Sequence, residues 1–189
     1  MGTYFGHEEV SAEEKTEKVN AVFTNVSKYY RFMNDVMCVG THHIWRRNAI
    51  LSLECMPGDC VLDLACGTGD CGEMIIEEIP GGKLFCVDAN EQMLNECKAK
   101  IKSPLASFLH IEAENLPKIE PKLDKAIICF GIRNFTDPKL ALERVIDNMR
   151  YGARIVILEF NPPMSSSIPS AYNQYIKNVL PRLGKKLTG

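Results

Sequence analysis

Short apolar runs alternate with helix-like segments through the middle of the chain. Five runs have the length and composition of buried strands: residues 60–64, 84–88, 108–112, 125–130 and 154–160. Helix-like patterns at residues 90–102 and 138–150 lie between some of these runs, and Asn90 and Asp137, the latter followed by Pro138, are expected to cap their starts. This alternation predicts an α/β fold, in which a parallel sheet is covered by helices on both faces. We expect the strand order 3-2-1-4-5, with ligands bound at the carboxyl ends of the strands.

Both ends of the chain show helical periodicity outside this core. Ser11 and Glu14 have the spacing of a capping box, and apolar residues then recur at helical spacing from Val19 to Met33. A second apolar helical face runs from Ile168 to Leu180. We expect one structural domain with three parts: a helical cap (1–56), the α/β core (57–161) and an amphipathic helix (162–189).

The segment 61–70, VLDLACGTGD, predicts a strand, a tight turn and the start of a helix. Glycine at Gly67 and Gly69 allows positive φ and lets a ligand approach the backbone more closely than a Cβ would permit. A nucleotide-type cofactor is therefore expected at this turn.

Charge favours one cofactor over its main rival. With Gly72 the turn reads G-x-G-x-x-G, and Asp88 follows near the spacing of a ribose-binding acid, so an NAD-linked oxidoreductase is one interpretation. However, a pyrophosphate needs free N–H groups and no competing anion, whereas Asp63 and Asp70 place two carboxylates at the turn. S-adenosylmethionine has no phosphate, carries a sulfonium and an amino group, and suits this acidic site.

The turn resembles motif I of class I S-adenosylmethionine-dependent methyltransferases. Three further segments resemble the ubiquinone/menaquinone biosynthesis C-methyltransferase family, UbiE, and they read FTNVSKYYRFMNDVMCVGTHHIW (23–45), FGIRNFTD (130–137) and ILEFNPP (157–163). The resemblance extends over nearly the whole chain from Tyr4. The opening TYFGHEEVSAEEKTEKV (3–19) is similar to the ubiquinone branch of proteobacteria and mitochondria.

The resemblance implies a Rossmann-like C-methyltransferase that methylates the ring of a polyprenyl benzoquinol, with demethylmenaquinol as a second acceptor. Together with the turn, it predicts cofactor contacts at Asp63, Gly67, Thr68, Gly69, Asp88, Ala89, Met93, Glu112, Ala113 and Cys129. On the acceptor side it predicts Arg133, Asn134 and Tyr30, with Asn34 nearby. Arginine stays protonated, so Arg133 is expected to stabilise the quinol oxyanion, while a water or Tyr30 accepts the proton.

The chain departs from the family pattern at several places. Arg31 stands where the family has an acid, Cys66 replaces a glycine, and residues 150–153 read RYGA where the family has KPGG. The family also continues past the equivalent of Gly189 with further helix and two strands. The fifth strand is therefore expected to be an exposed edge, unless the chain is a fragment or another element covers it.

Composition limits the classes of partner. The chain of 189 residues has a formal net charge of −2 and no basic stripe, which excludes general nucleic-acid binding. No run approaches the ~18 apolar residues of a membrane span, and the acidic start is no targeting peptide. We expect a cytoplasmic protein, peripheral at the inner membrane through its amphipathic helices, or a matrix protein after removal of a targeting segment. A homodimer and a quinone-synthesis complex, with this chain as enzyme or as non-catalytic scaffold, are the partner hypotheses.

The eight cysteines form no C-x-x-C pair, and Cys60, Cys86 and Cys129 fall in apolar runs. They are interpreted as reduced, buried thiols in a protein without a metal. The alternative is a zinc site that uses Cys66, Cys71 and one histidine of the pair His42 and His43.

Overall fold

A five-stranded parallel sheet forms the centre of the computed structural model, which describes residues 3–5, 8–11, 14–15, 18 and 40–160. Its strands are β3 (Cys60–Leu64), β4 (Lys83–Asp88), β5 (Ala106–His110), β6 (Leu123–Cys129) and β7 (Met149–Leu158). Every neighbouring pair is parallel, and the spatial order is β5-β4-β3-β6-β7. The predicted α/β class and the strand order 3-2-1-4-5 are confirmed.

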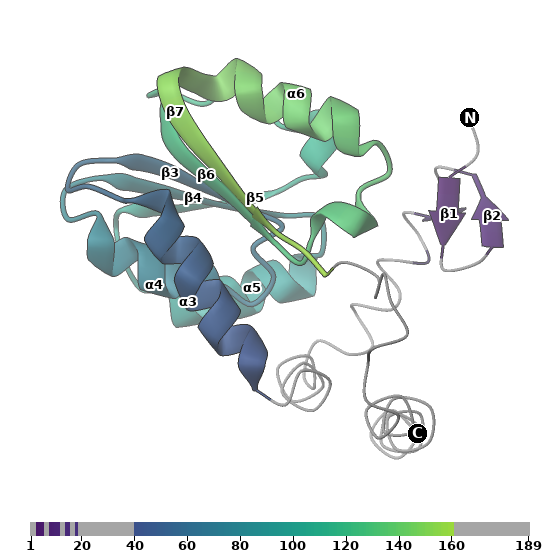
Figure 1. Cartoon of the computed structure of the whole chain (residues 1–189), viewed down its shortest axis with the longest axis horizontal. Coiled ribbons are helices and arrows are strands. Elements are labelled where there is room, and N and C mark those ends of the chain that lie inside the picture. The colour runs from purple at the N-terminus through teal and green to yellow at the C-terminus, as the bar shows by residue number, and fades with distance from the viewer. Residues whose placement is uncertain (1–2, 6–7, 12–13, 16–17, 19–39, 161–189) are drawn as a thin grey trace, which may run out of the picture.

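Helices cover both faces of the sheet (Figure 1). One face carries α3 (Thr41–Leu53), α4 (Asp70–Glu78) and α5 (Glu91–Lys100), and the other carries α6 (Pro138–Asn148). Two 3-10 turns, η2 (Ala113–Asn115) and η3 (Ile132–Asn134), follow β5 and β6. Alternate residues of the strands enter separate hydrophobic clusters on the two faces, because successive side chains of a strand point to opposite sides.

Two helix starts were predicted from their capping residues, and hydrogen bonds confirm both. Asn90 Oδ1 accepts from the Met93 N–H at 3.0 Å, and Asp137 Oδ1 accepts from the Leu140 N–H at 3.0 Å. Pro138 occupies the first position of α6, where no N–H is needed.

The bounds of two strands differ from those predicted. β5 ends at His110, so Glu112 lies beyond the strand as the residue before η2. β7 begins at Met149 and includes residues 150–153, whereas a helix to residue 150 and a strand from residue 154 were predicted. The pairing shifts register between Leu123 and Lys125, and Gly152 takes φ 80°, so the extra residues form a bulge within the strand.

The parts outside the sheet are described only in places. A short hairpin of β1 (Thr3–Phe5) and β2 (Glu8–Val10) was not predicted. The Ser11 and Glu14 capping box is confirmed, since each backbone N–H donates to the other side chain, at 2.9 and 3.1 Å. The helical faces predicted over residues 19–33 and 168–180, with Tyr30 and Asn34, lie outside the described residues.

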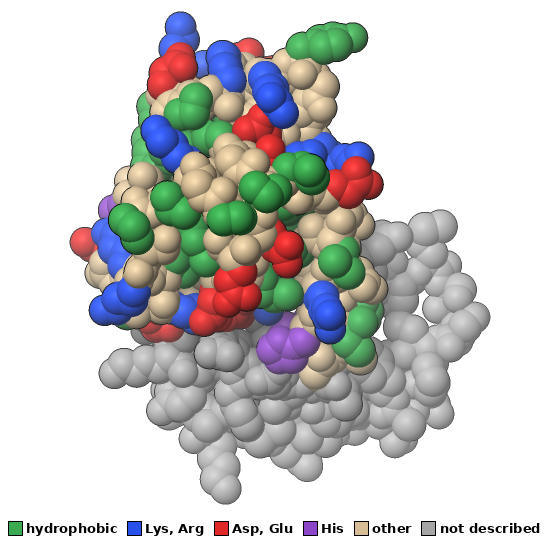
Figure 2. All heavy atoms as spheres, turned by 90° about the vertical axis from the view of Figure 1, so that its left-hand side faces the viewer, with side chains coloured by type: hydrophobic (Ala, Val, Ile, Leu, Met, Phe, Trp, Pro, Cys, Tyr) green, Lys and Arg blue, Asp and Glu red, His purple; other side chains and the backbone are tan. Residues whose placement is uncertain are grey.

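The charges on the surface and the pairing at the edge of the sheet are relevant to the expected partners. Figure 2 shows acidic and basic side chains intermixed on the face presented, without a basic stripe across it. Within the residues that the structure describes, no helix is long and apolar enough to traverse a bilayer, and β7 pairs only with β6.

Candidate functional site

The turn after β3 brings the backbone to the edge of a cavity. Ala65, Gly67 and Gly69 all have positive φ, at 58°, 54° and 80°. The chain thus bends sharply between the strand and α4, as the glycine spacing predicts. Gly67 has no heavy atom within 4 Å of the place where a Cβ would stand, so its backbone is open to a ligand.

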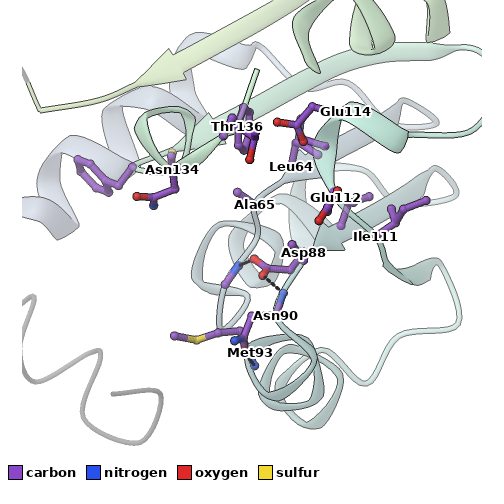
Figure 3. A pocket seen from close by; sticks show the side chains of 18 residues that line it. Leu64, Ala65, Asp88, Asn90, Met93, Ile111, Glu112, Glu114, Asn134 and Thr136 are labelled. Carbon is purple, nitrogen blue, oxygen red and sulfur yellow. Dashed lines mark hydrogen bonds between the residues drawn. The ribbon is translucent and has the colours of Figure 1, made fainter. Parts of the chain in front are cut away.

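Asp88 at the end of β4 holds this turn in place. Its Oδ2 accepts from the Gly67 N–H and its Oδ1 from the Asn90 N–H, both at 2.8 Å (Figure 3). Burial raises the pKa of Asp88, and these two N–H donors oppose the rise. Each carboxylate oxygen keeps a second lone-pair direction, so Asp88 can still accept hydrogen bonds from two vicinal hydroxyls.

A cavity of about 110 Å³ lies at the carboxyl ends of β3, β4, β5 and β6. Eight of the predicted site residues line it: Gly67, Asp88, Ala89, Met93, Glu112, Ala113, Cys129 and Asn134. Sequence reasoning missed ten others: Leu64, Ala65, Val87, Asn90, Ile111, Glu114, Phe130, Gly131, Phe135 and Thr136. Figure 3 shows Asp88 and Glu112, from two neighbouring strand ends, both beside the cavity.

A second, smaller cavity of about 30 Å³ adjoins the first and contains the remaining predicted cofactor residues except one. Asp63 and Thr68 line it, together with Arg46 and Asp70. The two cavities share Ala65, Gly67 and Cys129 in their walls. The exception is Gly69, which lines neither and packs against Cys97, whose Sγ would lie 2.6 Å from a Cβ at this position.

Two buried polar atoms, one a hydrogen-bond acceptor and the other a donor, belong to residues in the walls of the small cavity. Asp63 is 1% exposed and its Oδ2 has no hydrogen-bond partner in the described structure. Arg46 is 7% exposed, and its Nε likewise has none. Burial raises the pKa of Asp63 to about 8, the charge of Cys97 adds to the rise, and Arg46 opposes it. Unsatisfied buried groups at a cavity wall mark a place for a polar ligand.

The charge argument made from the sequence needs correction here. Asp70 is not a free carboxylate, because Arg46 lies 3.2 Å from its Oδ2 and Lys100 pairs with its Oδ1. Burial raises the pKa of Asp63, which lessens the negative charge that this carboxyl carries near neutral pH. The acidic character of the turn therefore rests more on Asp88, and less on Asp63 and Asp70, than the sequence alone indicates.

The predicted acceptor residues take different positions. Asn134 lines the large cavity, but Arg133 does not. The Arg133 side chain is about half exposed, and its Nη1 lies 2.7 Å from Glu159 Oε1 at the end of the neighbouring strand. Sequence reasoning missed Glu159 as this partner, although parallel strands place their carboxyl ends side by side. The catalytic role of Arg133 stays a prediction.

An aromatic row leads from the large cavity to the surface. Phe130 lines the cavity with φ 58° and stacks on Phe160, with centroids 4.5 Å apart. Phe160 in turn meets Trp45 of α3 edge-on at 5.9 Å, and both are exposed. The left-handed φ of a large residue is strained, and such strain concentrates at functional sites.

Lys15 connects the start of the chain to the cavity rim. Its Nζ donates to the carbonyl oxygen of Phe135, a wall residue, at 2.6 Å. Burial lowers the pKa of this lysine, and the nearby Glu114 opposes the effect. No motif in the sequence marked this contact.

The seven cysteines in the described ranges are free thiols, and five are buried as predicted, whereas Cys55 and Cys129 are partly exposed. The alternative zinc site, with Cys66, Cys71 and a histidine as ligands, is wrong. Among the described residues, the group close enough to share an ion is Cys66, Cys86 and Cys97, with sulfurs within 4.8 Å of one another. Cys71 and the two neighbouring histidines are not part of it.

Comparison with known proteins agrees with this geometry. The ubiE/COQ5 methyltransferase family model matches residues 11–189. The chain is 37% identical to the ubiquinone/menaquinone biosynthesis C-methyltransferase of Teredinibacter turnerae, over 98% of this chain and 77% of that protein. The protein of the same name from Francisella philomiragia is also 37% identical, over 98% and 76%.

Solved structures share the fold at lower identity. The YcgJ protein of Bacillus subtilis has a TM-score of 0.59 at 20% identity, over 75% of this chain and 58% of its own. A methyltransferase of Geobacter sulfurreducens in complex with S-adenosyl-L-homocysteine has a TM-score of 0.51 at 19% identity, over 59% and 46%. The sequence matches confirm the predicted class of enzyme, an S-adenosylmethionine-dependent methyltransferase, and the chain belongs to the ubiE/COQ5 methyltransferase family.

Proposed function

We propose that this protein transfers the methyl group of S-adenosylmethionine to a ring carbon of a polyprenylated quinol. The names of its relatives support a step in ubiquinone or menaquinone synthesis. The observation that carries the proposal is the pair of adjoining cavities, one beside Asp88 and one with unpartnered atoms of Asp63 and Arg46 in its walls.

The larger cavity suits adenosine. Asp88 accepts the two ribose hydroxyls, as charge-assisted hydrogen bonds. Glu112, whose Oε2 already accepts from Asn115 at 3.1 Å, keeps its other oxygen for the amine of the base. Met93 and Ala113 supply apolar contact to the ring from the cavity wall.

The smaller cavity suits the amino-acid end of the same molecule. Asp63 Oδ2 accepts from the α-amino group, and Arg46 Nε donates to the α-carboxylate, so that each unpartnered atom gains a partner. In this proposal the sulfonium lies between the two cavities, which share Gly67 in their walls. A dinucleotide would instead need its pyrophosphate at this turn, where Asp63 and Asp88 stand.

Methyl transfer needs an electron-rich ring carbon in line with the S–CH₃ bond, at about 3 to 3.5 Å. The ring carbon bonds to the methyl group, the bond to sulfur breaks, and the proton on that carbon is lost to a water or to Tyr30. Asn134 in the wall of the large cavity and Arg133 at its rim orient the quinol. The charge of Arg133 stabilises the phenolate that makes the ring nucleophilic.

The apolar tail of the quinol follows the row of Phe130, Phe160 and Trp45. Phe130 and Phe160 are stacked and the third ring is exposed, so the row gives a tail continuous aromatic contact from cavity to surface. Trp45→Ser tests this role. We expect it to raise KM for a substrate with a long tail and to leave KM for a one-isoprene analogue unchanged.

Calorimetry with two ligands tests the cofactor, and a transfer assay tests the reaction. We expect S-adenosylhomocysteine to bind and NADH not to bind. With labelled S-adenosylmethionine, label should enter the ring carbon of a demethylated benzoquinol or naphthoquinol. Cofactor binding with no transfer to either quinol would contradict the proposed reaction and favour a scaffold role.

A further inference from the structure

Three thiols lie directly beneath the cofactor turn. Cys66 belongs to the turn itself, Cys86 to β4 and Cys97 to α5. The sulfurs of Cys66 and Cys97 are 3.9 Å apart, and all three sulfurs lie within 4.8 Å of one another. Thirty residues separate Cys66 from Cys97 in the chain, so the fold rather than local sequence brings them together.

Each thiol of the close pair is linked to the cofactor turn, since Cys66 is part of the turn and Cys97 packs against it. The Cys97 Sγ lies against Gly69, where a Cβ would approach it to 2.6 Å. Cys66 is followed at once by Gly67, whose N–H is donated to Asp88. Any change in the distance between the two sulfurs is therefore transmitted to the turn that holds Asp88.

Cys66 and Cys97 differ in their exposure to solvent. Cys97 is fully buried, but Cys66 lines the small cavity and retains 8% of its exposure. The cavity, at about 30 Å³, has room for a molecule close to water in size. Hydrogen bonds with Cys66 and Cys86 lower the pKa of Cys97, whereas hydrogen bonds with Cys86 and Cys97 raise the pKa of Cys66, so the thiolate of the cluster rests on Cys97 and Cys66 holds the proton.

We propose that Cys66 and Cys97 are a redox modification site, which a hydroperoxide oxidises to a disulfide that deforms the cofactor turn. Cys66 passes its proton to Cys97, and its sulfur attacks hydrogen peroxide. An S–O bond forms, the O–O bond breaks, and the hydroxide that leaves takes up a proton from solvent to become water. Cys97 then attacks the Cys66 sulfur, the S–S bond forms, the S–O bond breaks, and a second water leaves. The two sulfurs lose two electrons and the peroxide gains two.

A disulfide fits this position better than a metal ion. The group offers three ligands, whereas structural zinc sites use four. Three thiolates around a divalent ion would also bury a net negative charge near Asp63 and Asp88. A disulfide is neutral and apolar, so it suits surroundings that include Ile101 and Leu84.

Bond formation draws the two sulfurs from 3.9 Å to about 2.05 Å. The shortening pulls Cys66 toward α5 and so disturbs the hydrogen bond from the adjacent Gly67 N–H to Asp88. Oxidation is thereby expected to weaken cofactor binding about tenfold or more, the effect of losing one charge-assisted hydrogen bond. This consequence rests on the proposed position of S-adenosylmethionine, but disulfide formation does not.

The test begins with the full chain reduced, desalted and treated with hydrogen peroxide. Free thiols are then alkylated, and the peptides are mapped by mass spectrometry. We expect one linkage, Cys66 to Cys97, which dithiothreitol removes and saturating S-adenosylhomocysteine slows. The Cys97→Ser variant should lose the linkage and keep its affinity after peroxide treatment. The Cys55→Ser variant, which changes a half-buried thiol outside the cluster, should behave as the unchanged protein.

Three results would overturn the inference. Linkages that join other cysteines, or no linkage while the Cys66 sulfur is oxidised further, would remove the pair as a modification site. Equal affinity of oxidised and reduced protein for S-adenosylhomocysteine would remove its coupling to the turn. One zinc ion retained per chain after incubation and desalting, and lost in Cys97→Ser, would show a metal site instead. A reduced protein that binds no S-adenosylhomocysteine counts against the proposed function, whatever the peptide map shows.

Discussion

Arg133, the residue before Asn134 of the large cavity wall, is joined to Glu159 by an ion pair of 2.7 Å between Nη1 and Oε1. The Glu159 carboxylate also accepts from the backbone N–H of Arg133, at 3.4 Å. The guanidinium lies 5.3 Å from the Phe160 ring centroid. Because these contacts come from the end of the neighbouring strand, they fix the position of a charge that would otherwise be free at a surface. The pair is part exposed, so it adds little stability, about 0 to 1 kcal/mol.

We expect Arg133→Met to lower methyl transfer by roughly 10² to 10³, the typical cost of one donor to a developing oxyanion. Affinity for S-adenosylmethionine should not change, because the residue lines neither cavity. The measurement is quinol methylation under saturating S-adenosylmethionine, with binding followed separately.

Two variants separate catalysis from a surface ion pair. Arg133→Lys should recover part of the rate, because an ammonium keeps the charge but lacks the planar fork. Glu159→Gln keeps Arg133 itself and should retain most of the turnover. Near-normal turnover by Arg133→Met would end its catalytic role and direct attention to Asn134.

Asp88→Ala is expected to weaken S-adenosylmethionine binding by about 2 to 4 kcal/mol, since each hydrogen bond to a charged group contributes about 1.5 to 3. Part of this loss comes from the turn, because Gly67 and Asn90 lose their acceptor as well. Asp147→Asn, an exposed acid of α6, is the control. Calorimetry that gives equal affinities for the two variants would remove Asp88 from the site.

The sheet was predictable because its signals are local. The strand of residues 60–64 was predicted at its observed bounds, since every one of its residues is buried and a glycine turn ends it. Asn90 and Asp137 identified two helix starts through capping chemistry that acts within four residues. Glu112 illustrates the limit, because periodicity did not show that β5 ends before it.

Contacts between distant segments were not predictable. Arg46 and Asp70 are 24 positions apart, and only the packing of α3 against α4 brings the guanidinium to the carboxylate. That pairing reversed the interpretation of Asp70 as a free anion. The thiols of Cys66 and Cys97 meet for the same reason, since neither residue carries a motif that points to the other.

Asp63→Asn should flatten the pH dependence of stability. Burial raises the pKa of Asp63 from 3.8 to about 8, so the folded protein keeps a proton that the unfolded chain releases between these pH values. The free energy of unfolding contributed by this group therefore falls as pH rises toward 8, by at most about 1.4 kcal/mol per pH unit. Urea unfolding at pH 5, 6, 7 and 8 measures the slope. The amide cannot ionise, so a slope as steep in the variant would show that other groups cause it.

Gly69→Ala and Gly81→Ala form a matched pair that tests the packing under the cofactor turn. Both glycines have left-handed φ, 80° and 78°, so each substitution costs about 1 to 2 kcal/mol in backbone strain. A Cβ at Gly81 meets nothing within 4 Å, whereas a Cβ at Gly69 would lie 2.6 Å from the Cys97 sulfur. We expect Gly69→Ala to lose about 1 to 3 kcal/mol more, the usual cost of overpacking.

The Cys97→Ala variant shows whether the Cys97 sulfur causes the additional loss of stability in Gly69→Ala. Removing it from the unchanged protein leaves a small cavity and lowers stability, but in the Gly69→Ala background the same change relieves the clash. The loss caused by Cys97→Ala in urea unfolding should therefore be smaller in that background, or become a gain. Strictly additive losses would mean that the sulfur does not press on the turn. In that case a change at Cys97 would not be transmitted through the turn to Gly67 and Asp88.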